Sequence, residues 1–400
     1  MNQNIKKLTE ISQKDEKIIL GLMSGTSLDG LDMALCKVNG FGLNTKVEVL
    51  KYTTYPYSES LQHKIREVFA KDAVKMQQVC LLHSRIANVH ARMIMSTLEE
   101  WGVSPLDIDL MASHGQTIYH APKRLHLKPH FTNSTLQLGD ADHLAYKTGI
   151  ITISDFRQKH IAAGGEGAPL AVYGDYLLFS SDDENRVLLN IGGIANFTYL
   201  PAGFKANEVF STDTGAGNTL IDTIIRQFMP PKQYDEGGKI ASECVVNEVL
   251  LQTLKKHPFF LQSAPKTTGQ ELFNLNFVQS AQASSNTLDL SVGDVIATLT
   301  RFTAETIAET IANVMPVGTQ CNIYVSGGGA KNLTLMNWLK DLMPHYHLHR
   351  FEELGYSGDA KEAILFAVLA NETLSSEPLN LGRGDLKIPA VSFGKISFPI

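Results

Sequence analysis

Residues 21–32, GLMSGTSLDGLD, predict a tight turn between two strands. An apolar run precedes the turn and an alternating run follows it. Gly25 and Gly30 allow the backbone to approach a ligand closely. Backbone N–H groups and hydroxyls suit phosphate oxygens, and the carboxylates of Asp29 and Asp32 suit Mg²⁺ or a sugar hydroxyl. An ordinary hairpin turn uses the same residue types, so both interpretations stay open on this stretch alone.

A second copy of the same pattern favours the ligand-binding interpretation. Residues 186–200, RVLLNIGGIANFTYL, again predict strand, Gly-Gly turn and strand, about one domain length later. Two glycine-rich segments follow, STDTGAGNTLID at 211–222 and VSGGGAKN at 325–332, and each leads into a helical pattern. A strand, a glycine turn and a helix start present free N–H groups to a phosphate or a nucleoside. The sequence therefore predicts a duplicated nucleotide-binding architecture.

This arrangement resembles the hexokinase, Hsp70 and actin superfamily, and within it the anhydro-N-acetylmuramic acid kinase family. The closer resemblance spans residues 17–370, and the motifs that carry it are GLMSGTSLDGLD, SHGQTIYH (113–120), LQLGD (136–140), SDFR with AAGGEGAPL (154–157 and 162–170), NIGGIANFT, TDTGAGNTLID, TGQELF and GDAKEA (358–363). Two positions depart from the family pattern. His160 stands where an acidic residue is expected, and Glu166 where Gln is expected.

The resemblance implies an α/β fold of two ribonuclease H-like domains, with mixed sheets flanked by helices and with nucleotide and sugar in the cleft between the domains. We expect residues 1–16 to form a flexible lead-in. Residues 17–185 would form the first actin-like domain, completed by residues 375–400. Residues 186–374 would form the second.

The same resemblance implies ATP and Mg²⁺ as cofactors, with Asp29 or Asp32 on the metal. The turn hydroxyls that suit phosphate are those of Ser24, Thr26 and Ser27. The expected nucleotide-binding residues are Gly25, Thr26, Ser27, Leu28, Asp29, Gly30, Leu31, Asp32, Asn190, Gly192, Gly193, Asn196, Asp213, Gly215, Gly217, Asn218, Gly327, Gly328, Gly329 and Asn332.

Asp155 ends an apolar, strand-like run and precedes a glycine-rich loop. Its carboxylate suits a general base, with Arg157 to orient it or to bind phosphate, and a plain Asp–Arg ion pair fits the residues equally well. The resemblance favours Asp155 as the catalytic residue. It also favours Glu362 as a sugar ligand over a carboxylate that only caps a helix. The expected substrate-binding residues are Asp29, His114, Gln116, Thr117, Arg157 and Glu362.

Composition restricts the function classes. The chain has 400 residues, 44% of them hydrophobic, and a formal net charge of −6, which argues against a nucleic-acid partner. The four cysteines are widely separated, and the longest apolar stretch is too short to span a bilayer, so we expect a cytoplasmic protein with no membrane partner. The family suggests a homodimer.

The resemblance implies a phosphotransferase with an alcohol group as acceptor. Its reaction would be ATP-dependent opening and phosphorylation of 1,6-anhydro-N-acetylmuramic acid to N-acetylmuramic acid 6-phosphate and ADP, in peptidoglycan recycling. A kinase of the same fold acting on another sugar is the alternative. A P-loop and a dinucleotide-binding fingerprint are both absent from the sequence.

Overall fold

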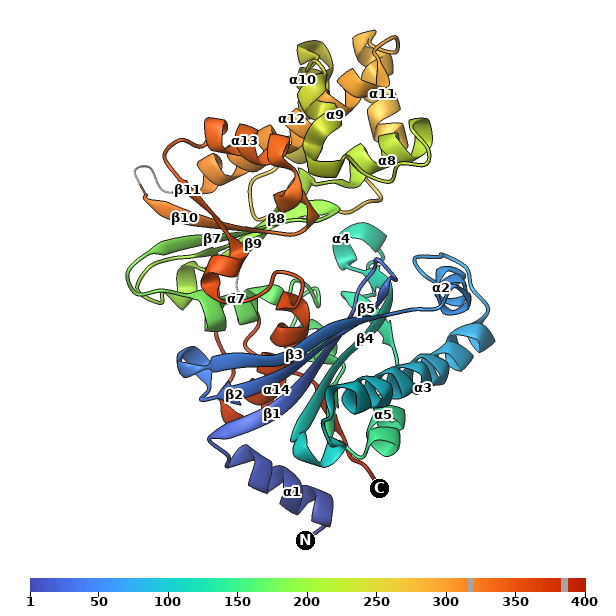
Figure 1. Ribbon diagram of the computed structural model, residues 1–400, viewed down its shortest axis with the longest axis vertical. Helices are drawn as coiled ribbons and strands as arrows, with labels where there is room; N and C mark the ends of the chain where they lie inside the picture. Colours follow the sequence, from blue (N-terminus) through green and yellow to red (C-terminus); the bar gives the residue numbers. More distant parts are fainter. Residues whose placement is uncertain (316–318, 383–387) are drawn as a thin grey trace. The chain divides into compact units, whose positions relative to one another are not determined.

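The computed structural model describes residues 1–315, 319–382 and 388–400. The chain divides into two compact units. Unit 1 comprises residues 1–179 and 359–400, and unit 2 comprises residues 180–358. Figure 1 shows both units, coloured along the sequence from the N-terminus to the C-terminus.

Unit 1 is built on a mixed sheet whose main strand order is β12-β6-β4-β1-β2-β3, with β5 paired to β4. The pairs β1–β2 and β2–β3 are antiparallel, whereas β1–β4 and β4–β6 are parallel. The strands are β1 (Glu16–Ser24), β2 (Gly30–Asn39), β3 (Lys46–Pro56), β4 (Leu110–Ala121), β5 (Ser134–Leu138), β6 (Thr152–Ser154) and β12 (Lys395–Ser397). The helices are α1 (Gln3–Ser12), α2 (Glu59–Arg66), α3 (Met76–Trp101), α4 (Lys123–His126), α5 (Ala141–Thr148), α6 (Phe156–Ala162), α7 (Ala171–Phe179) and α14 (Lys361–Ser375).

Unit 2 has a five-stranded sheet of order β11-β10-β7-β8-β9, which repeats the order and directions of β6-β4-β1-β2-β3 in unit 1. The pairs β7–β8 and β8–β9 are antiparallel, and β10 runs parallel to both β7 and β11. The duplication expected from the two hairpins is therefore present. The strands are β7 (Asn185–Ile191), β8 (Ile194–Leu200), β9 (Phe210–Ala216), β10 (Cys321–Ser326) and β11 (His347–Arg350). The helices are α8 (Thr219–Phe228), α9 (Lys239–Glu243), α10 (Glu248–Lys255), α11 (Leu275–Ser285), α12 (Val292–Val314) and α13 (Leu333–Leu342).

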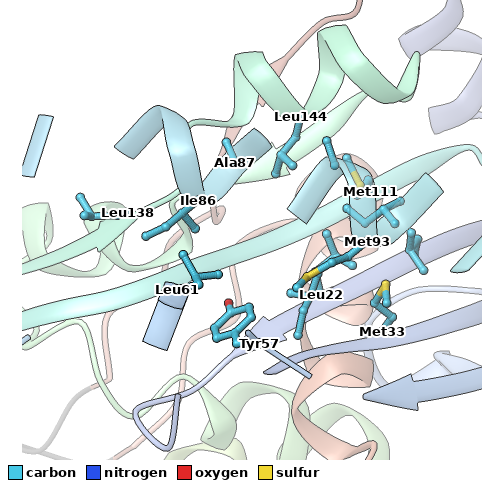
Figure 2. Packing of buried hydrophobic residues seen from close by; sticks show 14 of the residues in the cluster. Leu22, Met33, Tyr57, Leu61, Ile86, Ala87, Met93, Met111, Leu138 and Leu144 are labelled. Atoms are coloured by element: carbon cyan, nitrogen blue, oxygen red, sulfur yellow. The ribbon is translucent and has the colours of Figure 1, made fainter. Parts of the chain in front are cut away.

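The core of unit 1 lies between the sheet and the helices α2, α3 and α5. Figure 2 shows Leu22 and Met33 of the hairpin, Met93 and Ile86 of α3, and Met111 of β4 in this cluster. All five side chains are buried. Burial of a complete aliphatic side chain contributes about 1.5–3 kcal/mol, so this packing fixes the strands that end in the first hairpin.

The structure differs from the expected domain bounds in two places. Residues 3–12 form helix α1, whose Ile11 is buried, instead of a flexible lead-in. Helix α14, expected in the second domain, belongs to unit 1. A Cβ on Gly21 would lie 2.0 Å from the carbonyl oxygen of Ala363, so the absence of a side chain at Gly21 lets α14 pack against β1.

Unit 2 has two apolar clusters, one between its sheet and helices α12 and α13, the other among helices α8 to α12. Helix α12 contributes to both, with Phe302 in one and Ile307 in the other. Among the described residues, no helix combines the length and the apolar character needed to cross a bilayer.

Candidate functional site

The first hairpin turn joins β1 to β2 and is closed by Asp29. The Asp29 carboxylate accepts hydrogen bonds from the Ser27 hydroxyl (2.7 Å) and from the Gly30 amide (3.0 Å). Thr26, Ser27 and Asp29 are exposed, whereas Leu28 is buried with a positive φ of 59°. The tip of the turn therefore presents its polar groups to solvent, and Leu28 anchors it in the core.

The three glycines of this stretch have different roles. A Cβ on Gly30 would lie 2.4 Å from the carbonyl oxygen of Tyr55, so Gly30, like Gly21, allows a close approach of protein backbone. A Cβ on Gly25 would have its nearest neighbour, the Ser27 hydroxyl oxygen, at 3.6 Å. Gly25 is thus the glycine of this turn whose missing side chain leaves space for a ligand.

Asp32 lies near the start of β2, just beyond the turn. Its carboxylate accepts hydrogen bonds from Thr54 (2.5 Å) and Tyr52 (3.2 Å). Burial raises the pKa of Asp32, and the nearby charges of Asp29 and Asp359 raise it further. A divalent cation would relieve this repulsion, and Mg²⁺ is commonly held by one or two carboxylates together with phosphate oxygens. Asp29 and Asp32 therefore fit the metal expected from the sequence, whereas Leu31 between them is buried in the core.

His114 and Gln116 of β4 are buried, and their polar atoms bind protein. The Nδ1 of His114 contacts the carbonyl oxygen of Gly115 at 2.8 Å, and its Nε2 accepts a hydrogen bond from Arg157. Gln116 donates to the carbonyl oxygen of Gly25 at 3.0 Å. His114 therefore holds the side chain of Arg157, and Gln116 holds the first hairpin. Thr117, also expected at the sugar, is half-buried and accepts from Gln137 (3.3 Å).

Arg157 is held by neutral acceptors. Its Nε donates to His114 (2.8 Å) and its Nη1 to the carbonyl oxygen of Gly167 (2.6 Å). Desolvation lowers the pKa of Arg157 to about 10, with the charge of Glu362 opposing that change, and desolvation lowers the pKa of His114. Arg157 thus keeps its positive charge at neutral pH beside a neutral imidazole, which suits the recognition of an anion.

Glu362 lies in the first turn of α14. Solvent reaches its side chain, while the surrounding protein desolvates the carboxyl enough to raise its pKa. Arg157 opposes this shift, and Asp32 and Asp29 reinforce it. The structure of unit 1 therefore brings these four expected site residues into electrostatic contact.

Asp155 has a partner that the sequence did not predict. It adopts the left-handed conformation (φ 55°) immediately before α6, and its carboxylate forms an ion pair with Lys395 of β12. Arg157 donates its hydrogen bonds to His114 and Gly167 instead, so it does not orient Asp155.

His160 and Glu166, the two residues that depart from the family pattern, both hold the loop after α6 through hydrogen bonds. His160 is buried, and its Nδ1 accepts from the amide of Gly167 at 2.9 Å. Burial, with Arg157 adding to it, lowers the pKa of His160 to about 4. Glu166 accepts from Arg124 of α4 at 3.2 and 3.3 Å, which ties this loop to the segment after β4.

In unit 2, three polar side chains form a row across the sheet. Asn190 of β7 pairs with Asn196 of β8, and Asn196 pairs with Asp213 of β9. Residues directly opposite one another on neighbouring strands point to the same face. The half-buried Asn190, Asn196 and Asp213 therefore lie side by side next to the second hairpin.

Two other glycine turns of unit 2 pack against this hairpin. The amides of Gly217 and Asn218 donate to the carbonyl oxygens of Gly193 (2.9 Å) and Gly192 (2.8 Å). A Cβ on Gly327 would lie 2.7 Å from the carbonyl oxygen of Ile191. The segments around 192, 217 and 327 thus pack backbone against backbone.

Other expected nucleotide ligands are engaged within the protein. Asn332 is buried and caps α13 by accepting from the amide of Leu335 (3.0 Å). A Cβ on Gly215 would meet the ring of Phe260, and one on Gly329 would meet the side chain of Ile191. For these three positions the structure supports a packing or capping role. Gly328 differs, because a Cβ there would have its nearest neighbour, the Asn218 side-chain nitrogen, at 3.5 Å.

Sequence reasoning missed the position of the loop that contains TGQELF. The amide of Thr268 donates to the carboxylate of Asp213 (2.7 Å), and a Cβ on Gly193 would lie 3.0 Å from the Gln270 side-chain nitrogen. This loop therefore borders the second hairpin. The signal was present in the motif itself, but nothing in the sequence indicated that this loop lies beside Gly193.

Comparisons with known proteins find one family over almost the whole chain. A family model described as anhydro-N-acetylmuramic acid kinase matches residues 17–398. The anhydro-N-acetylmuramic acid kinase of Pseudoalteromonas translucida is 50% identical over 399 residues and covers 100% of both chains. That of Caldanaerobacter subterraneus subsp. tengcongensis is 39% identical over 393 residues, covering 98% of this chain and 99% of the relative. Among solved structures, the activator of the 2-hydroxyisocaproyl-CoA dehydratase from Clostridium difficile with bound ADPNP matches with a TM-score of 0.41 and 12% sequence identity. The match covers 89% of this chain and 95% of the activator chain. The chain belongs to the anhydro-N-acetylmuramic acid kinase family.

Proposed function

We propose that this protein is an ATP-dependent kinase that opens and phosphorylates 1,6-anhydro-N-acetylmuramic acid, giving N-acetylmuramic acid 6-phosphate and ADP. The observation that carries the proposal is the family match over residues 17–398, together with relatives of that name that cover the whole chain. The reaction would serve peptidoglycan recycling and amino-sugar catabolism. We also propose that the protein acts in the cytoplasm as a homodimer.

The nucleotide would be held by the two hairpins and the glycine turns. The absence of any atom closer than 3.6 Å to a Cβ at Gly25 and the exposed hydroxyls of Thr26 and Ser27 support phosphate binding in unit 1. The converging turns around residues 192, 217 and 327 support it in unit 2. Mg²⁺ would be held by Asp29 or Asp32 and would neutralise phosphate charge as it is transferred.

The chemistry joins two bond changes. Water attacks the anomeric carbon and loses a proton to a carboxylate base, and the bond from that carbon to the bridging oxygen breaks. The released oxygen attacks the γ-phosphorus, whose bond to the ADP oxygen breaks. Arg157 and Glu362 would bind the sugar, Arg157 through its charge and Glu362 through hydroxyl groups.

Two carboxylates are candidates for the base. The sequence predicts Asp155, whose carboxylate forms an ion pair with Lys395 through one of its two oxygens. Asp213 lies in the polar row beside the second hairpin, and the Thr268 amide orients its carboxylate. These contacts support Asp213, so we propose it as the base, with Asp155 as the alternative that the variants below distinguish.

The test is a reaction with ATP, Mg²⁺ and the anhydro sugar, followed by mass analysis of the product. The proposal expects a product that has gained both the elements of water and a phosphoryl group. A kinase of the same fold that acts on another sugar would leave the anhydro bridge intact. Failure to consume the anhydro sugar, with phosphorylation of an open sugar instead, would therefore overturn the proposal.

A further inference from the structure

A buried chain of hydrogen bonds runs from helix α3 to the first hairpin. His90 Nε2 lies 2.6 Å from the Tyr57 hydroxyl, which lies 2.6 Å from the Ser24 hydroxyl. Ser24 bonds to the side-chain oxygen of Gln116, whose nitrogen donates to the carbonyl oxygen of Gly25 (3.0 Å). All four side chains are buried, and Tyr57 belongs to the apolar cluster drawn in Figure 2.

The direction of every proton in this chain follows from its end at Gln116. The Gln116 nitrogen faces two carbonyl oxygens, those of Gly25 and Thr117, so its oxygen must face Ser24. Ser24 therefore donates to Gln116 and accepts from Tyr57. Because the Tyr57 proton is used in this way, the hydroxyl oxygen accepts from His90.

His90 must then carry its proton on Nε2. Within the described part of the chain, its Nδ1 is buried and has no hydrogen-bond partner. Burial lowers the pKa of His90 to about 4, so the ring is neutral at pH 7, in agreement with an unprotonated Nδ1. The side chain is only 1% exposed. A buried acceptor without a donor carries a cost, which the chain to the hairpin offsets.

We propose that Tyr57 and His90 are positioning residues that set the first hairpin for nucleotide phosphate. They act through Ser24 and Gln116, which fix the carbonyl of Gly25 and so the direction of the amides at the turn. The inference rests on the proposed function, because it takes the turn to bind ATP. It explains why Ser24, a hydroxyl that the sequence offered to phosphate, is buried with its own bonds satisfied inside the protein.

The test measures binding of a non-hydrolysable ATP analogue with Mg²⁺, and of the anhydro sugar, by calorimetry. Tyr57→Phe removes one hydroxyl, and we expect it to weaken nucleotide binding about five- to tenfold and sugar binding less than about twofold, the size expected for one lost buried hydrogen bond. The matched control is Tyr173→Phe, which removes another buried tyrosine hydroxyl of unit 1, bonded to the carbonyl of Pro389. The control should bind both ligands like the unmodified chain.

A double variant separates positioning from stability. In Tyr57→Phe, the His90 N–H has no acceptor, and adding His90→Leu removes that unsatisfied group. The double variant should therefore recover thermal stability relative to Tyr57→Phe while its nucleotide binding stays weak. Nucleotide affinity that returns with stability, or an unaltered affinity in Tyr57→Phe, would overturn the inference. An unmodified chain that binds no nucleotide would overturn the proposed function and this inference with it.

Discussion

Replacing Gly25 by Val tests whether the first turn receives phosphate. The structure gives this change little folding cost, because the nearest atom to a Cβ at this position is 3.6 Å away and the φ of Gly25 is not positive. Val also restricts the unfolded chain more than Gly does, which raises the free energy of unfolding of the variant by about 0.4–1 kcal/mol. We therefore expect a melting temperature within a few degrees of the unmodified protein.

The effect on the nucleotide should be much larger. A branched side chain fills the space through which phosphate reaches the backbone, and the loss of one or two charge-assisted hydrogen bonds, about 1.5–3 kcal/mol each, weakens binding at least about tenfold. Gly30→Ala gives the contrast, because its Cβ would lie 2.4 Å from the Tyr55 carbonyl oxygen and should cost about 1–3 kcal/mol of stability.

The assay is calorimetric titration of Gly25→Val with the ATP analogue and with the anhydro sugar, each alone, beside a thermal melt. We expect a selective loss of nucleotide binding in a folded protein. Unchanged nucleotide affinity, or an equal loss for both ligands at normal stability, would refute the role given to the turn.

Three other sets of variants test individual side chains. Asp213→Asn should lower turnover at least about a thousandfold with nucleotide binding kept within a few fold, and Asp155→Asn should lower it less; the reverse order in a steady-state assay would return the base to Asp155. His114→Ala should weaken sugar binding about tenfold by releasing Arg157, and should add little to Arg157→Ala in a double-mutant cycle; full additivity would separate the two residues. Burial raises the pKa of Asp222 to about 6, so the folded protein loses stability as pH rises from about 4 to 6. Asp222→Asn should therefore stabilise the protein by about 1–3 kcal/mol at pH 8 and have no effect near pH 3. Equal effects of the variant at both pH values in denaturant titrations would contradict this.

The sequence predicted the hairpins and glycine turns because their signals are local. An alternating apolar run around a Gly-rich turn is enough to predict a hairpin, and its repetition predicts the duplication seen in the two sheets. The role of each glycine was not predictable in the same way. Gly21 and Gly25 look alike in sequence, but a Cβ on Gly21 would clash with the backbone of α14, whereas one on Gly25 would make only ordinary contacts within its own turn.

Contacts between distant segments account for the remaining differences. Helix α14 follows the second sheet in sequence, yet packs on β1 of unit 1. His114 and Gln116 follow an apolar strand, which suggests ligand contact, but whether a polar side chain faces a ligand or the protein depends on the tertiary partners Arg157 and Gly25. The Lys395 partner of Asp155 lies 240 positions away, beyond any local pattern.

The most direct test of the central claim is the fate of solvent oxygen. The reaction is run in oxygen-18 water with ATP, Mg²⁺ and the anhydro sugar, and the product is analysed at early times against a control that contains only product. We expect the label at the anomeric hydroxyl and none in the transferred phosphate, because water attacks carbon and the sugar's own bridging oxygen attacks phosphorus. Label in the phosphate at those times, or an anhydro sugar left unconsumed, would contradict it.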